Sequence, residues 1–204
     1  MQIDPKGKEV GEIYRLMISV IVPRPIAFIS TVSKGGVLNL APFSYFMGVC
    51  SRPPTIAVSI IERPSGPKDT ANNIQDTAQF TVNIVTEEIA EKMNVASGDY
   101  PPEVDEFEAA GLTPVPSTLI TPPRVEESPI SMECRLVEMS KVGESPYASY
   151  LTLGEVLLFH IQDELWAGGE VDVRKLLAIG RMSGPRYTKT RDIFEMPRPR
   201  IKRE

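Results

Sequence analysis

Nineteen prolines lie in this 204-residue sequence, most of them at the joints between short apolar segments. Proline has no backbone N–H and a fixed φ, so it disfavours helix interiors and central strands and marks turns and edges. Pairs such as Pro53-Pro54 and Pro122-Pro123 separate segments rich in Val, Ile, Phe and Thr. Short β-branched segments between proline-rich or glycine-rich turns predict a mainly β fold.

The apolar segments predict the individual strands. Residues 25–32 are β-branched and aromatic, and the turn-forming residues 33–36 lead into 37–40, which predicts a β-hairpin. Further strands are expected at 55–61, 79–85, 130–139 and 151–161. The strands at 55–61 and 79–85 are apolar along most of their length, so we expect cover on both faces. Gly154 predicts a bulge in the last strand.

Helical signals are few and short. We expect a helix over about 70–77, a second over 87–96 and one more turn ending at Gly111. Six or more strands with two or three short helices favour a barrel or a closed, twisted sheet over a doubly wound sheet. One domain spanning 1–204 is the default at this length, and residues 196–204 read as a basic, solvated tail.

Composition excludes several function classes. Hydrophobic residues make up 42% and charged residues 24%, which is typical of a folded globular chain. The 22 basic and 27 acidic side chains give a net charge of −5, so the positive field of a nucleic-acid binder is missing. The charged N-terminus and the prolines after Leu16 predict neither an export signal nor a membrane span, and we expect a cytoplasmic protein.

Cysteine and histidine are scarce. Cys50, Cys134 and the single His160 cannot supply four ligands, so a closed zinc site is excluded and we predict no metal site. No serine or cysteine lies in a GxSxG-type turn, so we predict no hydrolase chemistry on this chain. We read His160 as a strand residue rather than an acid–base group, and we predict no catalytic side chain.

The segment 65–70 could bind an anion. Gly66 and Pro67 fix a tight turn, Asp69 or Thr70 could cap the following helix, and the N–H groups of the first helical turn would face an approaching phosphate. Lys68 adds a positive charge beside them. The alternative is a plain turn with a solvated lysine.

Two further segments could line a pocket. Asn39 and the run from Ala41 to Phe46 (Ala41, Pro42, Phe43, Ser44, Tyr45, Phe46) could form the wall of a planar-ligand site or contribute ordinary core aromatics. Arg24, Ser30 and Thr31 are polar among apolar neighbours and need partners if buried; the two hydroxyls could instead face water from a strand. Residues 180–187 form a basic turn that could close over a ligand, meet a second subunit, or be a surface loop.

In this order and spacing, these segments resemble the flavin reductase-like family of FMN-binding split barrels. The resemblance covers roughly residues 13–195, with 196–204 outside it. Each motif is short, and the specificity lies in their combination: RPIAFISTV at 24–32, NLAPFSYF at 39–46, the strand containing Ser59, KDTANNI at 68–74, FTVNIV at 80–85, PPRVEESPISMECRL at 122–136, LGEV at 153–156 and GRMSGPRY at 180–187.

The resemblance implies a Greek-key split β-barrel that forms a homodimer and holds FMN, rather than FAD, without a covalent bond. Lys68 and Thr70 would meet the phosphate, with Arg24, Ser30 or Thr31 contributing from the barrel side. The implied FMN-binding set is Arg24, Ser30, Thr31, Asn39, Ala41, Pro42, Phe43, Ser44, Tyr45, Phe46, Ser59, Lys68, Asp69, Thr70, Arg181 and Tyr187.

The isoalloxazine ring would lie along Ala41 to Phe46, with its N5 and O4 edge toward the N–H groups near Ser44 and Tyr45. The resemblance leaves open which subunit contributes the loop from Arg181 to Tyr187. Hydride transfer to a flavin needs stacked rings and a polar environment, not a side-chain nucleophile, so a chain without a catalytic dyad is expected.

The resemblance therefore predicts an NAD(P)H-dependent flavin reductase whose reduced flavin serves a partner oxygenase or another acceptor. Two alternatives stay open: an electron-carrier flavoprotein reduced by a protein donor, and a non-enzymatic module that binds another planar anion. The sequence does not distinguish NADH from NADPH.

Overall fold

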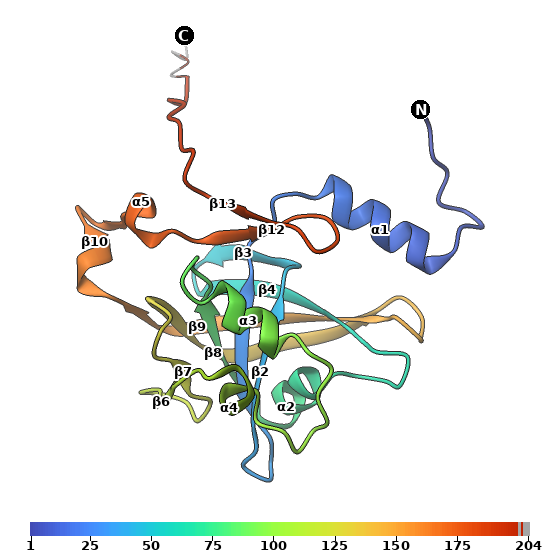
Figure 1. Cartoon of the computed structure of the whole chain (residues 1–204), viewed down its shortest axis with the longest axis horizontal. Coiled ribbons are helices and arrows are strands. Elements are labelled where there is room, and N and C mark those ends of the chain that lie inside the picture. The colour runs from blue at the N-terminus through green and yellow to red at the C-terminus, as the bar shows by residue number, and fades with distance from the viewer. Residues whose placement is uncertain (200, 202–204) are drawn as a thin grey trace.

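The computed structural model describes residues 1–199 and 201, and its main element is a seven-stranded antiparallel sheet (Figure 1). Its strand order is β2-β1-β5-β8-β9-β4-β3. The strands are β1 (Ala27–Val32), β2 (Leu38–Phe43), β3 (Phe46–Ser51), β4 (Pro54–Ile61), β5 (Gln79–Ile84), β8 (Ile130–Val142) and β9 (Ser149–Ile161). The predicted mainly β class is confirmed, and each expected strand is present.

The remaining elements are short. Three two-stranded pairs complete the β structure: β6 (Pro114–Val115) with β7 (Arg124–Val125), β10 (Trp166–Ala167) with β11 (Glu170–Val171), and β12 (Ile179–Arg181) with β13 (Tyr187–Lys189). The helices are α1 (Val10–Val20), α2 (Asp69–Thr77), α3 (Ala90–Ala96), α4 (Glu106–Ala110), α5 (Val173–Leu176) and the 3-10 turn η1 (Asp163–Leu165). Within the described residues, no helix has the length and apolar character needed to cross a membrane.

The predicted hairpin is formed by β1 and β2, which pair antiparallel with Ile29 opposite Ala41. Its turn uses Gly36 at φ +85, a backbone conformation that favours glycine. Successive side chains of β1 point to opposite faces of the sheet. Ile29 therefore packs in one apolar cluster and Phe28 in another, which is why the first half of this strand has apolar side chains on both faces.

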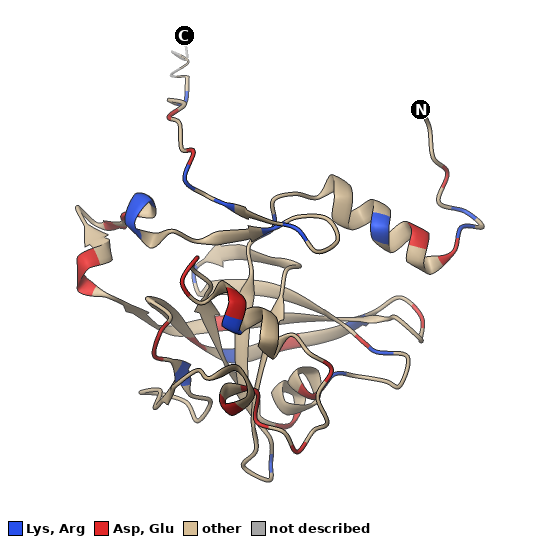
Figure 2. Cartoon of the chain, viewed as in Figure 1, with Lys and Arg blue, Asp and Glu red and all other residues tan. Residues whose placement is uncertain are grey.

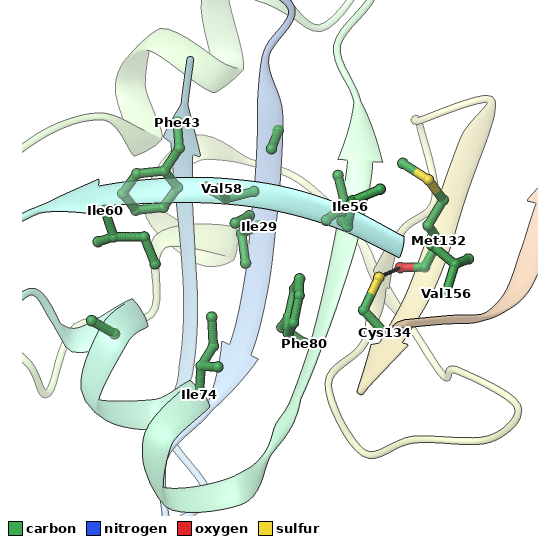
Figure 3. Close-up of a cluster of buried hydrophobic side chains, with 13 residues drawn as sticks. Ile29, Phe43, Ile56, Val58, Ile60, Ile74, Phe80, Met132, Cys134 and Val156 are labelled. Atoms are coloured by element: carbon green, nitrogen blue, oxygen red, sulfur yellow. Dashed lines mark hydrogen bonds between the residues drawn. The ribbon is translucent and has the colours of Figure 1, made fainter. Parts of the chain in front are cut away.

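The first cluster lies where α2 packs against the sheet (Figure 3). It contains Ile29, Phe43, Val58, Ile74 and Phe80 among other buried side chains. The second cluster lies where α3 and α4 cover the opposite side of β1 and β2, and it includes side chains of Leu40, Met93 and Phe107. The start of α2 and the end of α3 meet the end of β2, and this junction positions the site described below.

Gly154 has a packing role. A Cβ at this position would collide with the ring of Phe80, so only glycine lets β9 pass that side chain. The register between β8 and β9 shifts directly beside Gly154, as predicted, but the extra residue there is Val137 of β8. A second shift lies between Glu133 and Cys134, where the extra residue is Leu157 of β9.

Several expectations need correction. The helix α1 was not predicted, because the proline-broken run after Leu16 conceals it and none of its residues is buried in the core. Residues 180–187 are not a free loop but part of the β12–β13 hairpin. The predicted helix at 87–96 begins only at Ala90. Of the predicted tail, residues 196–199 and 201 are exposed without regular structure; 200 and 202–204 lie outside the described residues.

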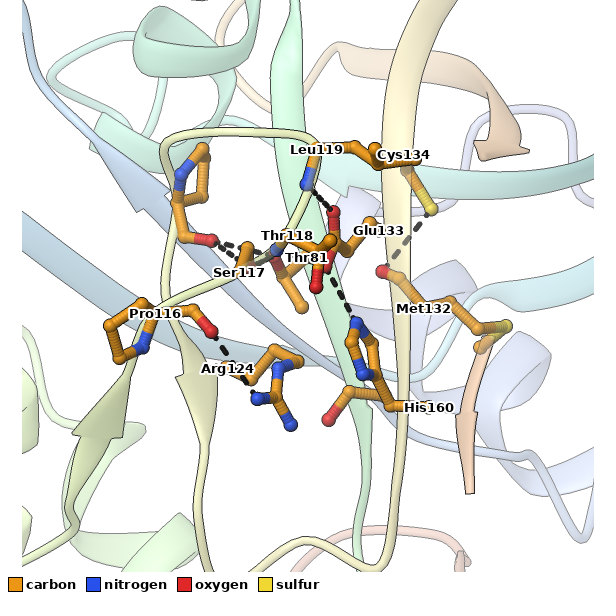
Figure 4. A network of polar contacts seen from close by, with 12 residues as sticks. Thr81, Pro116, Ser117, Thr118, Leu119, Arg124, Met132, Glu133, Cys134 and His160 are labelled. Carbon is orange, nitrogen blue, oxygen red and sulfur yellow. Dashed lines mark hydrogen bonds and ion pairs between the residues drawn. The ribbon is translucent and has the colours of Figure 1, made fainter. Parts of the chain in front are cut away.

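A polar cluster lies on the outer part of β8 (Figure 4). Glu133 is fully buried, and its carboxylate accepts hydrogen bonds from the N–H groups of Thr118 and Leu119, each at 2.6 Å, and contacts His160 Nε2 at 2.6 Å. His160 lies in β9, so its predicted placement in a strand is confirmed; its contact with the Glu133 carboxylate was not predicted. The carboxylate fixes the loop 117–119 against the sheet.

Candidate functional site

Most of the predicted FMN-binding residues meet in one cleft. It lies between α1, the end of β2, the start of α2, α3 and the β12–β13 hairpin, and its central part has a volume of about 340 Å³. This volume is within the range of small-molecule sites. The predicted residues that line it are Arg24, Asn39, Ala41, Pro42, Phe43, Ser44, Tyr45, Ser59, Lys68, Asp69, Thr70, Arg181 and Tyr187.

Lys68 lies at the centre of this cleft. It is the N-cap residue of α2, with no side-chain cap bond, so the expectation that Asp69 or Thr70 caps the helix is wrong. Its Nζ lies 5.7 Å from the centroid of the Phe43 ring. Burial, followed by repulsion from Arg63, lowers the pKa of Lys68. Among the described residues it has no carboxylate within ion-pair distance, so its charge is available to an anion.

The start of α2 offers backbone donors beside this ammonium. Ala71 and Asn72 donate to the carbonyl of Lys68, whereas the N–H groups of Asp69 and Thr70 have no acceptor within the described part of the chain. Unpaired N–H groups at a helix start and a half-buried cation form a site suited to a phosphate. These residues therefore fit the phosphate of a flavin mononucleotide.

Arg63 is a second cation at this end of the cleft, and no local pattern in the sequence points to it. It lines the same hollow, and its guanidinium is 2.6 Å from Asp99 and 3.4 Å from Asp69. Both carboxylates lie within ion-pair distance of Arg63, whereas they act on Lys68 only from a longer range, so Lys68 is the cation of this hollow without an ion pair among the described residues.

The wall along β2 ends in irregular backbone. Phe43 is the last residue of β2 and Phe46 the first of β3, which leaves Ser44 and Tyr45 between the strands. In the described structure the N–H groups of Ser44 and Tyr45 have no acceptor, while the Tyr45 carbonyl accepts from the N–H of Ser59 at 2.9 Å. Donors without partners beside an aromatic wall fit the polar edge of a flat heterocycle.

Burial, with a contribution from Tyr14, raises the pKa of Tyr45, although the nearby Arg24 opposes the shift. The Tyr45 hydroxyl therefore stays protonated at neutral pH. The side chain of Phe46 packs against the first apolar cluster and does not line the cleft, so it acts as a core aromatic.

Arg24 has a different role from the one expected. Its side chain is 4% exposed, and its guanidinium donates to the carbonyls of Ile18 at 2.8 Å, Ile21 at 2.6 Å and Met182 at 3.0 Å, and to Ser44 Oγ at 3.2 Å. These bonds clamp α1, the end of β2 and the β12–β13 hairpin together. Arg24 shapes the cleft, and its hydrogen-bonding capacity is largely used within the chain.

Ser30 and Thr31 do not reach the cleft. Both are fully buried, which also excludes the water-facing alternative. The Ser30 hydroxyl donates to the carbonyl of Pro123, and Thr31 Oγ1 donates to Asn39 Oδ1 at 3.2 Å. We therefore leave both out of the phosphate site, since partners inside the chain already satisfy them.

The β12–β13 hairpin brings Arg181 and Tyr187 into the cleft of its own chain. The Arg181 guanidinium lies 4.4 Å from the centroid of the Tyr187 ring, and Tyr187 Oη is 3.5 Å from Asn94 Oδ1. Figure 2 shows basic residues on this hairpin and both basic and acidic residues on α1. The pair lines the cleft together with Lys68.

Comparison with known proteins assigns the family. Residues 19–173 match the family model described as the flavin reductase like domain. This chain belongs to the flavin reductase-like family. Nitrilotriacetate monooxygenase component B from Bacillus cereus is similar at 36% identity and a TM-score of 0.93, covering 96% of this chain and 98% of that one.

Two further solved structures are similar to this chain. The 2-nitrobenzoate 2-nitroreductase of Pseudomonas fluorescens is 32% identical with a TM-score of 0.88, covering 98% of this chain and 96% of that one. A Shewanella frigidimarina protein with a split barrel domain is similar in fold at 23% identity and a TM-score of 0.84, covering 98% of this chain and 100% of that one. The large antiparallel sheet with few helices is the architecture of this flavin-binding family.

Sequence reasoning missed several residues of this family member's cleft. Tyr14 and Ile18 of α1 line it, as do Met93, Asn94 and Ser97 from α3 and the residue after it. The spacing of four between Tyr14 and Ile18, in an apolar stretch before a proline, was a helix signal that could have located α1. Asn94 and Ser97 carry no local signal, because only the packing of α3 over β2 brings them near Lys68.

Proposed function

We propose that this chain binds FMN without a covalent bond and acts as an NAD(P)H:flavin oxidoreductase. The observation that carries the proposal is the half-buried Lys68 at the start of α2, which makes no ion pair within the described residues and lies beside two N–H groups without acceptors. When bound, FMN supplies a ring that accepts hydride from a nicotinamide. The chain supplies the binding and orientation of that ring.

Each part of the cleft has a task in this proposal. Lys68 and the N–H groups of Asp69 and Thr70 hold the phosphate, and the segment from Ala41 to Tyr45 lies along the ring. The N–H groups of Ser44 and Tyr45 donate to the ring edge where negative charge develops. Arg181 and Tyr187 bound the other side of the cleft and exclude water from it. No side-chain nucleophile and no metal are required.

The phosphate site favours FMN over FAD, because the dianionic end of FMN matches one ammonium and a helix start. The proposal includes both NADH and NADPH as hydride donors. Release of reduced flavin to a partner oxygenase, or electron transfer to another acceptor, would complete the reaction. The similar Bacillus cereus protein is a monooxygenase component, which supports the first route.

We further propose that the sheet closes into a Greek-key split barrel in a single domain and that two copies form a homodimer. The exposed apolar residues of α1 support the dimer: Val10, Tyr14, Met17 and Val20 are between 43% and 66% exposed and recur at helical spacing. An uncovered apolar helix face is a typical interface. Cytoplasmic location and the lack of nucleic-acid partners stay predictions from the sequence.

Spectroscopy tests the proposal. The purified protein mixed with FMN is expected to show the visible absorption of bound flavin, and anaerobic addition of NADH or NADPH is expected to bleach it rapidly. Bleaching only with a protein donor would favour the electron-carrier alternative. A protein that binds no FMN would contradict both and favour a module for another planar anion.

A further inference from the structure

Glu106 is a buried carboxylate at the phosphate end of the cleft that the proposed reaction does not use. It begins α4, is 6% exposed, and lines the hollow that also contains Lys68 and Thr70. No cation of the described chain lies within ion-pair distance of it. A buried charge without an ion pair is costly unless hydrogen bonds compensate it, so its partners define its role.

Both oxygens of this carboxylate accept hydrogen bonds from β2. Glu106 Oε1 accepts from Asn39 Nδ2 at 2.9 Å, and Oε2 accepts from the N–H of Leu40 at 3.0 Å. Burial raises the pKa of Glu106, and the bonds from Leu40 and Asn39 offset only part of that increase. Two adjacent groups of one strand are therefore bound to one side chain of α4.

The carboxylate also fixes the direction of the hydrogen bonds beyond it. A carboxylate only accepts, so Asn39 must turn its NH₂ toward Glu106 and its oxygen away. That oxygen accepts from Thr70 Oγ1 at 2.7 Å and from Thr31 Oγ1 at 3.2 Å. Asn73 Nδ2 donates in turn to Thr31 Oγ1 at 3.0 Å. Each donor in this series of buried hydrogen bonds therefore has an acceptor, and the direction of every bond is fixed.

The consequence concerns the first turn of α2. The Thr70 hydroxyl proton is used on Asn39, so Thr70 presents its backbone N–H, rather than its hydroxyl proton, to an anion in the cleft. The same bond ties the start of α2 to β2, the strand whose end forms the wall at Ala41 to Tyr45. This series of hydrogen bonds therefore sets the spacing between the start of α2, where the phosphate would bind, and the segment from Ala41 to Tyr45, along which the ring would lie.

We propose that Glu106 is a positioning residue that, through Asn39 and Thr70, holds the N–H groups of α2 and Lys68 in place for the phosphate of FMN. The inference rests on the proposed flavin site and assigns Glu106 and Asn39 a role in selecting a phosphorylated flavin. Neither side chain need touch the ring.

The test compares the dissociation constants of FMN and riboflavin, which differ by the phosphate alone. In Glu106→Gln the side chain keeps its shape, but an NH₂ replaces one accepting oxygen, so one of the two β2 donors loses its acceptor. We expect the preference for FMN over riboflavin to fall by about fivefold to tenfold, with riboflavin affinity nearly unchanged. The ³¹P resonance of bound FMN is expected to shift as well.

Thr70→Val removes the hydroxyl that joins Asn39 to α2 and is expected to lower the same preference. If Glu106 acts through Thr70, the double variant E106Q/T70V is at most about twofold worse than the poorer single variant. Glu133→Gln is the matched control, since it alters an equally buried carboxylate on β8, bonded to loop N–H groups outside the cleft. We expect this control to keep the FMN preference and the ³¹P shift.

The outcomes separate the two levels of the proposal. A wild-type protein that binds FMN no more tightly than riboflavin contradicts the phosphate anchor and, with it, the role of Glu106. A wild-type preference that E106Q retains contradicts only the positioning role. Losses that multiply in E106Q/T70V would show that the two residues act separately, and an equal loss in E133Q would show general destabilisation; either result overturns the inference.

Discussion

Replacing Lys68 by alanine probes the charge on which the flavin site depends. The side chain is half-buried at the start of α2, and among the described residues it makes neither an ion pair nor a hydrogen bond. Its removal therefore leaves no orphaned partner and takes away a desolvated cation, so we expect the fold to be retained. We expect the variant to lose affinity for the phosphate-bearing ligand.

The magnitude follows from the lost contact. A hydrogen bond between an ammonium and a phosphate contributes about 1.5–3 kcal/mol. This range corresponds to about a 10-fold to 150-fold weaker dissociation constant for FMN. Riboflavin, which lacks the phosphate, is expected to bind the variant and the wild-type protein with nearly equal affinity.

The assay is quenching of flavin fluorescence on titration with protein, at low and high salt. Lys34→Ala is the matched control, because Lys34 is exposed and paired with Asp76 at 2.8 Å outside the cleft. The salt dependence of FMN binding is expected to weaken in Lys68→Ala and to persist in Lys34→Ala. An unchanged FMN affinity in Lys68→Ala, or an equal loss for riboflavin, would refute the reasoning.

Three further outcomes are expected. Arg24→Ala should lower the free energy of unfolding by about 2–4 kcal/mol in urea titrations, because the buried guanidinium donates to three part-buried carbonyls and to Ser44 Oγ. A change below about 0.5 kcal/mol would contradict the clamp. Burial alone would raise the pKa of Glu133, but the loop N–H groups and His160 outweigh it and hold the pKa below the ordinary value. The contribution of Glu133 to the stability of the fold should therefore be full above the unfolded-state pKa and disappear as pH falls through the folded-state pKa. Glu133→Gln should weaken this loss of stability at acid pH. Gly154→Ala should destabilise by about 1–3 kcal/mol through overpacking against Phe80, and a neutral effect in calorimetry would show that β9 shifts freely.

Local patterns predicted much of the sheet. The hairpin of β1 and β2 was predictable because a β-branched and aromatic segment leads into a glycine turn and an apolar segment follows, and α2 because a turn precedes a short periodic segment. By contrast, α1 buries none of its residues in the core, and a pattern of buried apolar residues therefore cannot locate it. Its start and end were missed for this reason.

The site was predictable where a residue's role is local, and not where the partner is distant. Lys68 could be predicted as a phosphate-binding residue because it lies between a turn and the start of a helix in the sequence. Ser30 was misplaced because its partner, the carbonyl of Pro123, is 93 residues away. Glu106 escaped notice because its role depends on Asn39, 67 residues earlier, which only the packing of α4 against β2 reveals.

A crystal structure of the protein grown with FMN tests the central claim most directly. The account predicts the phosphate within hydrogen-bond distance of Lys68 Nζ and of the N–H groups of Asp69 and Thr70, with the ring along Ala41 to Tyr45. A flavin bound with its phosphate away from the start of α2, or a cleft that stays closed to FMN at saturating concentration, would contradict it.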